Sequence, residues 1–272
     1  MTFEKKNEIV IMDFSGIYRQ ERFHEGTHAH WVEVQGLPGS NCYCDEEAKE
    51  FLSRKIEKLP VQGIHFIDSG NYHYMSRIWL EKIQEPFRLL LFDNHTDMQP
   101  PAFGGILSCG GWADASLREL PLLREVVLTG PSEEDFLQVE RKCRERVRFF
   151  GKEALRESGG KGLDAFLQEI PLDLPIYLSI DKDVLCKEDA FTAWSQGDMK
   201  LDVLVSCLEK LLDRLKAEDQ VLLGVDICGE CDPGAGEGYE KNDRANAALL
   251  TLPFQERFMP VQGGQENKKY EE

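Results

Sequence analysis

The sequence predicts a three-layer α/β fold, in which a central, mainly parallel sheet lies between two layers of helices. The first observation is that short apolar runs rich in β-branched residues recur along the chain and have the length of buried strands. The second is that stretches with helical periodicity separate several of these runs. Alternating strands and helices favour a parallel sheet whose two faces are both covered.

Seven apolar runs are expected to be strands, and the segments between them supply six helices. The expected strands are residues 9–14, 61–67, 89–92, 126–128, 147–150, 176–180 and 221–227. The expected helices are residues 45–59, 74–83, 133–146, 163–168, 202–215 and 242–250. Ser132 is a typical N-cap, and the acidic residues Glu133 and Glu134 suit the positive end of a helix dipole.

Length and composition favour one domain. A chain of 272 residues is long enough to bury one large core. The sequence contains no internal repeat, low-complexity linker or composition shift that would mark a boundary. We therefore expect a single domain over residues 1–258, followed by a polar C-terminal tail over residues 259–272.

The charge balance argues against two classes of partner. The chain carries 49 Asp and Glu residues against 32 Lys and Arg, a net charge of −17, whereas nucleic acids and anionic membranes bind clustered basic residues. No apolar stretch approaches the roughly 18 residues of a membrane span, and the N-terminus lacks the apolar core of a signal peptide. We expect a cytoplasmic protein whose eight cysteines are free thiols. The sequence leaves open whether it forms a homo-oligomer.

Acidic residues and histidines follow three of the expected strands. If the chain stays extended past Phe92, alternate side chains there project to the same side. Ligands collect beyond the carboxyl ends of parallel strands, and several charged groups in one crevice need a strong neutraliser. The sequence therefore predicts a metal site with these ligands: His73 after residues 61–67, Asp93, His95 and Asp97 after residues 89–92, and Asp181 and Asp183 after residues 176–180.

Oxygen ligands outnumber imidazoles in this set, and it contains no thiolate. One Asp-x-His-x-Asp block alone could equally be a helix cap beside a solvated loop, but a second acidic block and a third candidate favour metal. The donor types indicate two Mn²⁺ ions per chain, with Fe(II) or Co(II) fitting nearly as well. Such a pair would lower the pKa of a bridging water and hold it against a trigonal carbon.

These motifs resemble those of the arginase and agmatinase (ureohydrolase) family. Residues 93–97 resemble its Asp-Ala-His-x-Asp block, residues 179–185 resemble its Asp-x-Asp block, and residues 69–73 are a looser form of its Gly-Gly-x-His turn. Order and spacing agree over roughly residues 60–235. The resemblance implies the three-layer arginase-type fold, a catalytic domain and a dinuclear manganese centre that hydrolyses a C–N bond.

Three residues are expected to act in the site, and the resemblance implies the role of the first, Glu230. Glu230 corresponds to a glutamate that grips the substrate guanidinium, whose fork geometry a carboxylate matches. One extra residue separates Glu230 from Ile227, and a surface acid in an acidic loop is the alternative. Asp97 is expected to be catalytic by orienting the bridging water. Trp112, which lies near four glycines, is expected to form an aromatic wall or lid that binds substrate, with plain core packing as the alternative.

The sequence departs from the family pattern where the substrate is selected. Residues 108–112 contain no histidine, although arginases carry a catalytic histidine in this loop. We therefore expect a hydrolase that releases urea from a guanidinium carried by an agmatine-like amine or by peptidyl arginine, not from free arginine. The alternatives are a metal-dependent amidohydrolase or formimino hydrolase, and a non-catalytic metal-binding regulatory protein of the same fold.

Two further motifs have simpler explanations. His24, His28 and His30 have a spacing that suits no common closed metal site, so a solvated loop is favoured, although His28 or His30 could replace the missing proton shuttle if the loop covered the cleft. Cys228 and Cys231 have the Cys-x-x-Cys form. Packing cysteines are favoured over a redox or zinc role, because zinc requires more ligands.

Overall fold

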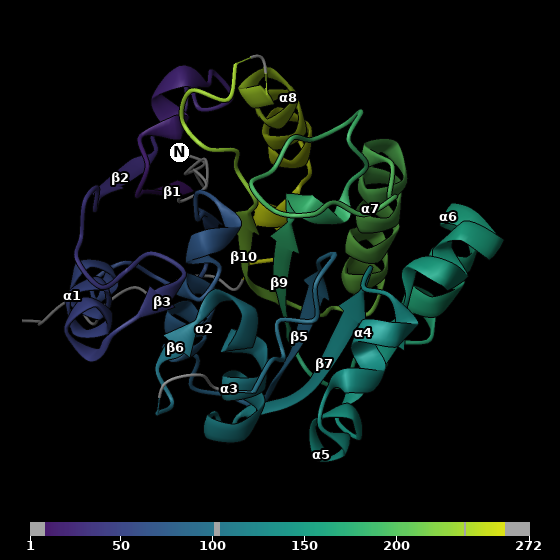
Figure 1. Cartoon of the computed structure of the whole chain (residues 1–272). Helices are drawn as coiled ribbons and strands as arrows, with labels where there is room; N and C mark the ends of the chain where they lie inside the picture. Colours follow the sequence, from purple (N-terminus) through teal and green to yellow (C-terminus); the bar gives the residue numbers. More distant parts are fainter. Residues whose placement is uncertain (1–8, 101–103, 237, 259–272) are drawn as a thin grey trace, which may run out of the picture.

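An eight-stranded parallel sheet organises the molecule (Figure 1). The computed structural model describes residues 9–100, 104–236 and 238–258, so the expected tail at 259–272 lies outside the described residues. The strand order is β2-β1-β4-β10-β9-β5-β7-β8. The strands are β1 (Ile9–Asp13), β2 (His30–Glu33), β4 (Ile64–Phe66), β5 (Phe87–Phe92), β7 (Leu123–Thr129), β8 (Val147–Phe150), β9 (Ile176–Asp181) and β10 (Leu222–Cys228).

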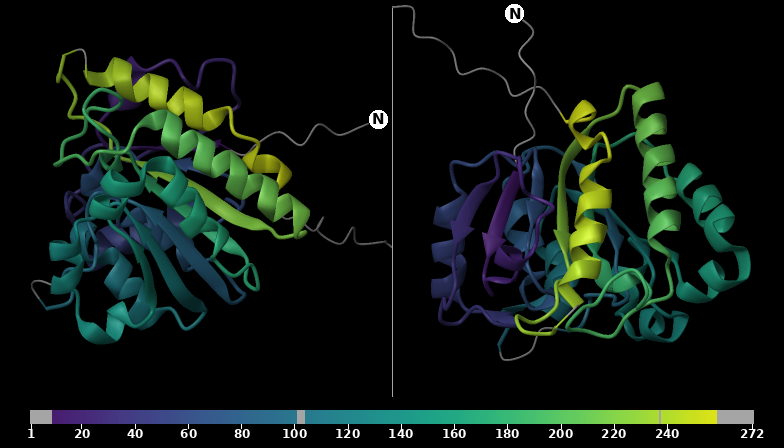
Figure 2. Two further views of the ribbon diagram at one scale, coloured as in Figure 1. Left: turned by 90° about the vertical axis from the view of Figure 1, so that its right-hand side faces the viewer. Right: turned by 90° about the horizontal axis from the view of Figure 1, so that it is seen from above.

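Helices cover both faces of this sheet, which makes the three-layer fold that the sequence predicts (Figure 2). One layer contains α1 (Glu46–Ile56), α2 (Met75–Leu80) and α3 (Trp112–Glu119), and the other contains α6 (Lys152–Gln168), α7 (Leu201–Ala217) and α8 (Gly238–Leu250). Two short helices, α4 (Glu133–Gln138) and α5 (Arg141–Arg144), precede β8. A separate antiparallel ribbon pairs β3 (Tyr43–Cys44) with β6 (Leu107–Ser108).

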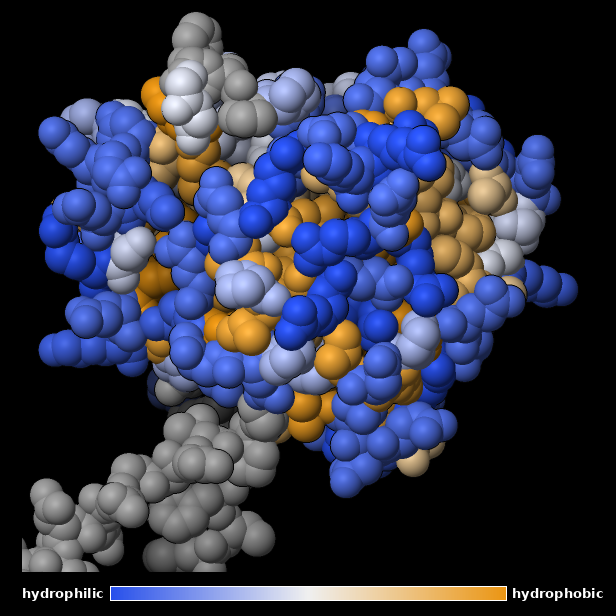
Figure 3. Space-filling model, turned by 90° about the horizontal axis from the view of Figure 1, so that it is seen from below, coloured by the Kyte–Doolittle hydropathy of each residue, from blue (hydrophilic) through white to orange (hydrophobic). Residues whose placement is uncertain are grey.

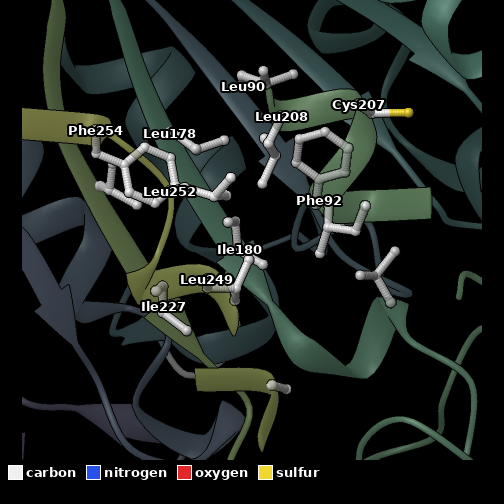
Figure 4. Close-up of a cluster of buried hydrophobic side chains, with 14 of the residues drawn as sticks. Leu90, Phe92, Leu178, Ile180, Cys207, Leu208, Ile227, Leu249, Leu252 and Phe254 are labelled. Atoms are coloured by element: carbon white, nitrogen blue, oxygen red, sulfur yellow. The ribbon is translucent and has the colours of Figure 1, made fainter. Parts of the chain in front are cut away.

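Alternation along the strands divides the core into two halves. In β5, Leu90 and Phe92 pack toward α7 and α8, whereas Leu89 and Leu91 belong to the cluster on the opposite face. Figure 4 shows the first cluster, in which side chains of β5, β9 and β10 meet those of α7, α8 and the segment after α8. Both faces of the sheet are therefore buried against helices, which explains why the strands are continuous apolar runs.

All seven expected strands are present, but two of the helix predictions are wrong and two further elements were not predicted. The expected helix 133–146 is broken because Val139 and Glu140 adopt extended ψ values of 139° and 134°. The expected helix 163–168 begins eleven residues earlier, at Lys152, and is kinked at Gly159, where φ is 59°. Strand β2 and helix α3 were not expected. Strand β2 is a short edge strand, and α3 follows a glycine-rich segment that resembles a loop in sequence.

The face of the molecule seen from below in the orientation of Figure 1 is mainly hydrophilic. Figure 3 shows charged and polar residues over most of one face, with hydrophobic residues in small patches among them. None of the helices in the described residues combines the length and hydrophobicity of a membrane span.

Removing core volume at the centre of the sheet should destabilise the protein. Leu178 in β9 is 1% exposed and lies in the cluster of Figure 4, so Leu178→Ala should lower the free energy of unfolding by about 3 kcal/mol in urea denaturation. Leu137 in α4 is 63% exposed and is the matched control. Equal losses of unfolding free energy in Leu178→Ala and Leu137→Ala would contradict the assignment of Leu178 to the core.

Candidate metal centre

The six predicted metal ligands meet at the carboxyl ends of three parallel strands. The cavity they line, of about 270 Å³, also touches β3, β6 and the loop between β9 and α7. We call the six residues the ligand cluster: His73, Asp93, His95, Asp97, Asp181 and Asp183. The structure therefore brings together all of the predicted ligands.

Turns position Asp97 and Asp183, whereas Asp181 is the last residue of strand β9. The expectation that the chain stays extended past Phe92 is wrong, because β5 ends there and Asp97 has a positive φ of 49°. Asp183 lies in a one-turn 3₁₀ helix (Lys182–Val184), and its amide donates to Asp181 Oδ1 at 2.8 Å. Such strained or tightly turned backbone is typical of functional sites.

His73 lies at the centre of one group of ligands. Its Nδ1 is 3.0 Å from Asp97 Oδ2, 3.3 Å from Asp93 Oδ2 and 3.4 Å from Asp181 Oδ2. Its Nε2 lies 3.0 Å from Ser179 Oγ. A hydrogen bond on the distal nitrogen fixes the ring of a metal-binding histidine, leaving Nδ1 for the metal.

His95 lies in a second group that shares Asp93 with the first. Its Nδ1 is 2.8 Å from Asp183 Oδ2 and 3.5 Å from Asp93 Oδ1. Its Nε2 lies 2.8 Å from Ser195 Oγ, so this ring is also held from behind. Two compact candidate metal groups share Asp93: His73, Asp93 and Asp97 form one, and Asp93, His95 and Asp183 form the other. A third group combines His73 and Asp181 with Cys228.

The electrostatics of the ligand cluster favour bound cations. Burial, followed by repulsion from Asp183 and Asp93, raises the pKa of Asp181 well above its usual value. Burial and repulsion from Asp93 raise the pKa of Asp183 to about 7. Burial opposes charge on His95, but the Asp183 and Asp93 carboxylates outweigh it and raise its pKa to about 12.

A buried oxygen of the shared ligand accepts no hydrogen bond. Asp93 Oδ2 is buried without one, although His73 Nδ1 lies 3.3 Å away. A buried carboxylate oxygen without a hydrogen bond is costly, and a divalent cation removes that cost. The donor set therefore fits two metal ions that prefer oxygen and imidazole ligands.

The structure places Glu230 outside the cavity. Its side chain is 0% exposed and is not among the residues that line the cavity. Gly229, the extra residue, has a φ of 88°, and a Cβ there would lie 2.2 Å from Asp181 Oδ1. The backbone of Gly229 thus approaches the ligand cluster, whereas the carboxylate of Glu230 points into the protein.

Glu230 belongs to a buried polar network beneath the site. It forms an ion pair with Lys182, and Asn246 Nδ2 donates to both Glu230 Oε1 and Glu21 Oε2 at 2.8 Å. Burial and the charge of Glu230 raise the pKa of Glu21 to about 10. Glu21 is therefore protonated at neutral pH, so Lys182 balances a single carboxylate charge.

Trp112 lies behind the ligand cluster instead of over the cavity. It is 0% exposed, and its Nε1 donates to Asp97 Oδ2 at 2.6 Å. Its ring centroid is 4.8 Å from that of His73. The side chain therefore supports two members of the ligand cluster from the core.

The remaining sequence candidates lie elsewhere. His24 Nε2 is 3.0 Å from the Tyr18 carbonyl oxygen, and His28 is exposed. His30 begins the edge strand β2, which β1, β4 and β10 separate from β9. None of the three lines the cavity. Cys228 and Cys231 are buried and free, and Cys228 lies close to His73 and Asp181 although it does not line the cavity.

Sequence reasoning missed the residues that hold the ligand cluster in place. Asn94, inside the first acidic block, donates from Nδ2 to the Ser195 carbonyl oxygen at 2.9 Å and accepts from Lys152 Nζ at 2.7 Å. Trp194, next to Ser195, lines the cavity. Asn94 stands where the family motif has alanine, which is a visible difference. No sequence signal linked Asn94 to the distant loop that contains Trp194 and Ser195.

Replacing two ligands should remove metal binding. Asp181→Asn/Asp183→Asn withdraws two carboxylate charges, so manganese bound after loading and desalting should fall from about two ions per chain to fewer than one, by elemental analysis. The melting temperature should also lose the increase that manganese gives the unaltered protein. Glu209→Gln, on the exposed face of α7, should bind as the unaltered protein does. Unchanged manganese content in the double variant would refute the ligand assignment.

Replacing only Lys182 of the buried ion pair should destabilise the protein more than replacing both Lys182 and Glu230. Lys182→Met leaves Glu230 buried and unpaired, so the free energy of unfolding should fall by about 3–5 kcal/mol, measured in urea with saturating manganese. Lys182→Met/Glu230→Gln should lose less than Lys182→Met alone. In the exposed pair with Glu188, Lys200→Met should change stability by less than about 1 kcal/mol. If the loss in the double variant equalled the sum of the losses in Lys182→Met and Glu230→Gln, the pairing would be contradicted.

Comparisons with known proteins agree with this architecture. The family model described as "Arginase family" matches residues 43–227. An uncharacterized protein of Thermotoga maritima is 30% identical over 258 residues, which are 94% of each chain. Among solved structures, arginase from Bacillus subtilis superposes with a TM-score of 0.67 at 14% identity, covering 91% of this chain and 98% of the other. Formimidoylglutamase from Bacillus subtilis superposes with a TM-score of 0.63 at 14% identity, covering 92% and 87%. The chain belongs to the arginase family.

Proposed function

We propose that this protein is a two-metal hydrolase that cleaves the C–N bond of a guanidino group and releases urea, with a substrate other than free arginine. The observation that carries the proposal is the ligand cluster, in which two candidate metal groups share Asp93 at one cavity. Membership of the arginase family supports hydrolysis of a non-peptide C–N bond as the reaction.

The ligand cluster suits two manganese ions. His73 with Asp93, Asp97 and Asp181 would hold one ion, and His95 with Asp93 and Asp183 the other. Predominantly oxygen donors favour manganese over zinc. When bound, two such ions supply an activated water nucleophile at neutral pH and polarise the carbon that it attacks.

The protein's own groups prepare the site for this reaction. Trp112 holds one oxygen of Asp97 at 2.6 Å, so its carboxylate keeps one orientation and would orient the attacking water. Ser179 and Ser195 hold the two imidazoles by their distal nitrogens. Groups fixed before the substrate arrives need no reorganisation during the reaction.

The cavity wall argues against free arginine. Among the described residues, those that line the cavity beside the ligand cluster are uncharged: Cys42, Tyr43, Gly70, Gln99, Ser108, Cys109, Gly110 and Trp194. An α-carboxylate or α-ammonium would lose its hydration there without gaining an ion pair. A guanidino group whose α-groups are blocked, as in peptidyl arginine, fits this wall better.

The burial of Glu230 favours a second candidate function. The carboxylate expected to grip a guanidinium is paired with Lys182 outside the cavity. A formimino or amide group, which needs a weaker anchor, would react at the same metal pair. A solved structure named formimidoylglutamase has the same fold.

Assays of the manganese-loaded protein should separate these functions. We expect urea from an arginine-containing peptide or a blocked arginine at a rate at least about tenfold above that from free arginine, since free α-groups are desolvated without a partner. Agmatine tests whether a free ammonium is tolerated. Asp183→Asn should abolish urea release, whereas Glu209→Gln should retain it.

The outcomes assign the function directly. Release of ammonia from formimino or amide substrates without urea from any guanidino compound would replace the first candidate with the second. No turnover of either class, with two manganese ions bound, would favour a metal-binding protein without catalysis.

A further inference from the structure

The loop between β9 and α7 places an aromatic side chain at the ligand cluster. Trp194 lines the cavity and is 44% exposed. A Cβ added to Gly70 would lie 2.8 Å from Trp194 Cδ1 and 3.3 Å from Asp181 Oδ2. The edge of the indole and a predicted metal ligand therefore border the same small space, which only a glycine leaves open.

The indole is held in a fixed position before any ligand binds. Trp194 Nε1 donates to Asn71 Oδ1 at 2.9 Å, and Asn71 Nδ2 donates to Asn41 Oδ1 at 2.9 Å. The Thr192 hydroxyl donates to the Trp194 carbonyl oxygen at 3.0 Å. Three segments that surround the cavity thus fix one ring, which lowers the entropic cost of binding against it.

The base of the loop is attached to the ligand cluster itself. Gly197 N donates to the Asp183 carbonyl oxygen at 2.7 Å, and Cys186 N donates to the Met199 carbonyl oxygen at 2.8 Å. Ser195 Oγ contacts His95 Nε2 at 2.8 Å. The Trp194 ring centroid lies 6.0 Å from that of His95, with the planes 74° apart. The loop therefore positions an aromatic surface relative to the metal ligands.

A partly exposed indole that lines the cavity of the ligand cluster suits a planar cation. A guanidinium is planar, delocalised and weakly hydrated, so it stacks on aromatic rings better than an ammonium does, and tryptophan is the strongest aromatic partner for cations. Among the described residues that line the cavity, every carboxylate belongs to the ligand cluster. An aromatic anchor can therefore replace the carboxylate that Glu230 commits to Lys182.

We propose that the Trp194 ring holds the planar guanidinium of the substrate beside the ligand cluster, and that the remainder of the substrate is uncharged. This rests on the proposed function for the identity of the reacting group. Trp194 is then the specificity-determining residue of the site. The uncharged wall formed by Cys42, Gln99 and Ser108 receives the remainder of the substrate.

Direct binding tests this proposal without turnover. Butylguanidine, which has an uncharged remainder, is titrated calorimetrically into the manganese-loaded protein, into Trp194→Ala and into Trp194→Phe. The affinity should fall at least about fivefold in Trp194→Ala and be largely restored in Trp194→Phe. Phe191→Ala is the matched control, because Phe191 is 41% exposed on the same loop but does not line the cavity. Free arginine should bind the unaltered protein at least about tenfold more weakly than butylguanidine.

Equal affinities for Trp194→Ala and Phe191→Ala would overturn the role of Trp194, as would the absence of butylguanidine binding to the unaltered protein. Tighter binding of free arginine than of butylguanidine would overturn the uncharged remainder. Binding that depends on Trp194 without any urea release would leave this proposal standing and refute the proposed function. Urea release with the same KM in Trp194→Ala as in the unaltered protein would refute the role of Trp194 and leave the proposed function standing.

Discussion

The mutual repulsion of four buried aspartates is the constraint on which the rest of the site depends. Parallel strands bring Asp93, Asp97, Asp181 and Asp183 to one edge of the sheet. Burial and the neighbouring carboxylates raise the pKa of Asp181 and of Asp183 there. The two imidazoles relieve part of this repulsion. Divalent cations would relieve it while the carboxylates stay deprotonated. The charges that destabilise the metal-free protein would then provide the affinity for metal.

Beneath the ligand cluster, the backbone of Gly229 lies so close to Asp181 that no side chain would fit there. The carboxylate of the next residue, Glu230, turns inward to Lys182. Lys182 lies between two predicted metal ligands in sequence, yet its ammonium points away from them into the network with Asn246. The six predicted ligands thus meet at one cavity, and the loop that carries Trp194 supplies part of its wall.

The sequence was sufficient for features that depend on local pattern. Continuous apolar runs predicted the seven main strands, and acidic blocks at their ends predicted the residues of the ligand cluster. Features that depend on a turn or on distant packing could not be predicted. Asp97 reaches the site through a left-handed backbone conformation, not through strand alternation. Trp112 and Glu230 have the right chemistry for a substrate site, but tertiary packing directs both side chains into the interior.

Anomalous diffraction at the manganese absorption edge tests the central claim most directly, because it locates each ion independently of activity. Crystals grown with manganese should show two peaks in the ligand cluster, one beside His73 and Asp97 and the other beside His95 and Asp183, with Asp93 between them. A single peak, or peaks remote from Asp93, would contradict a dinuclear centre at the carboxyl ends of β5 and β9.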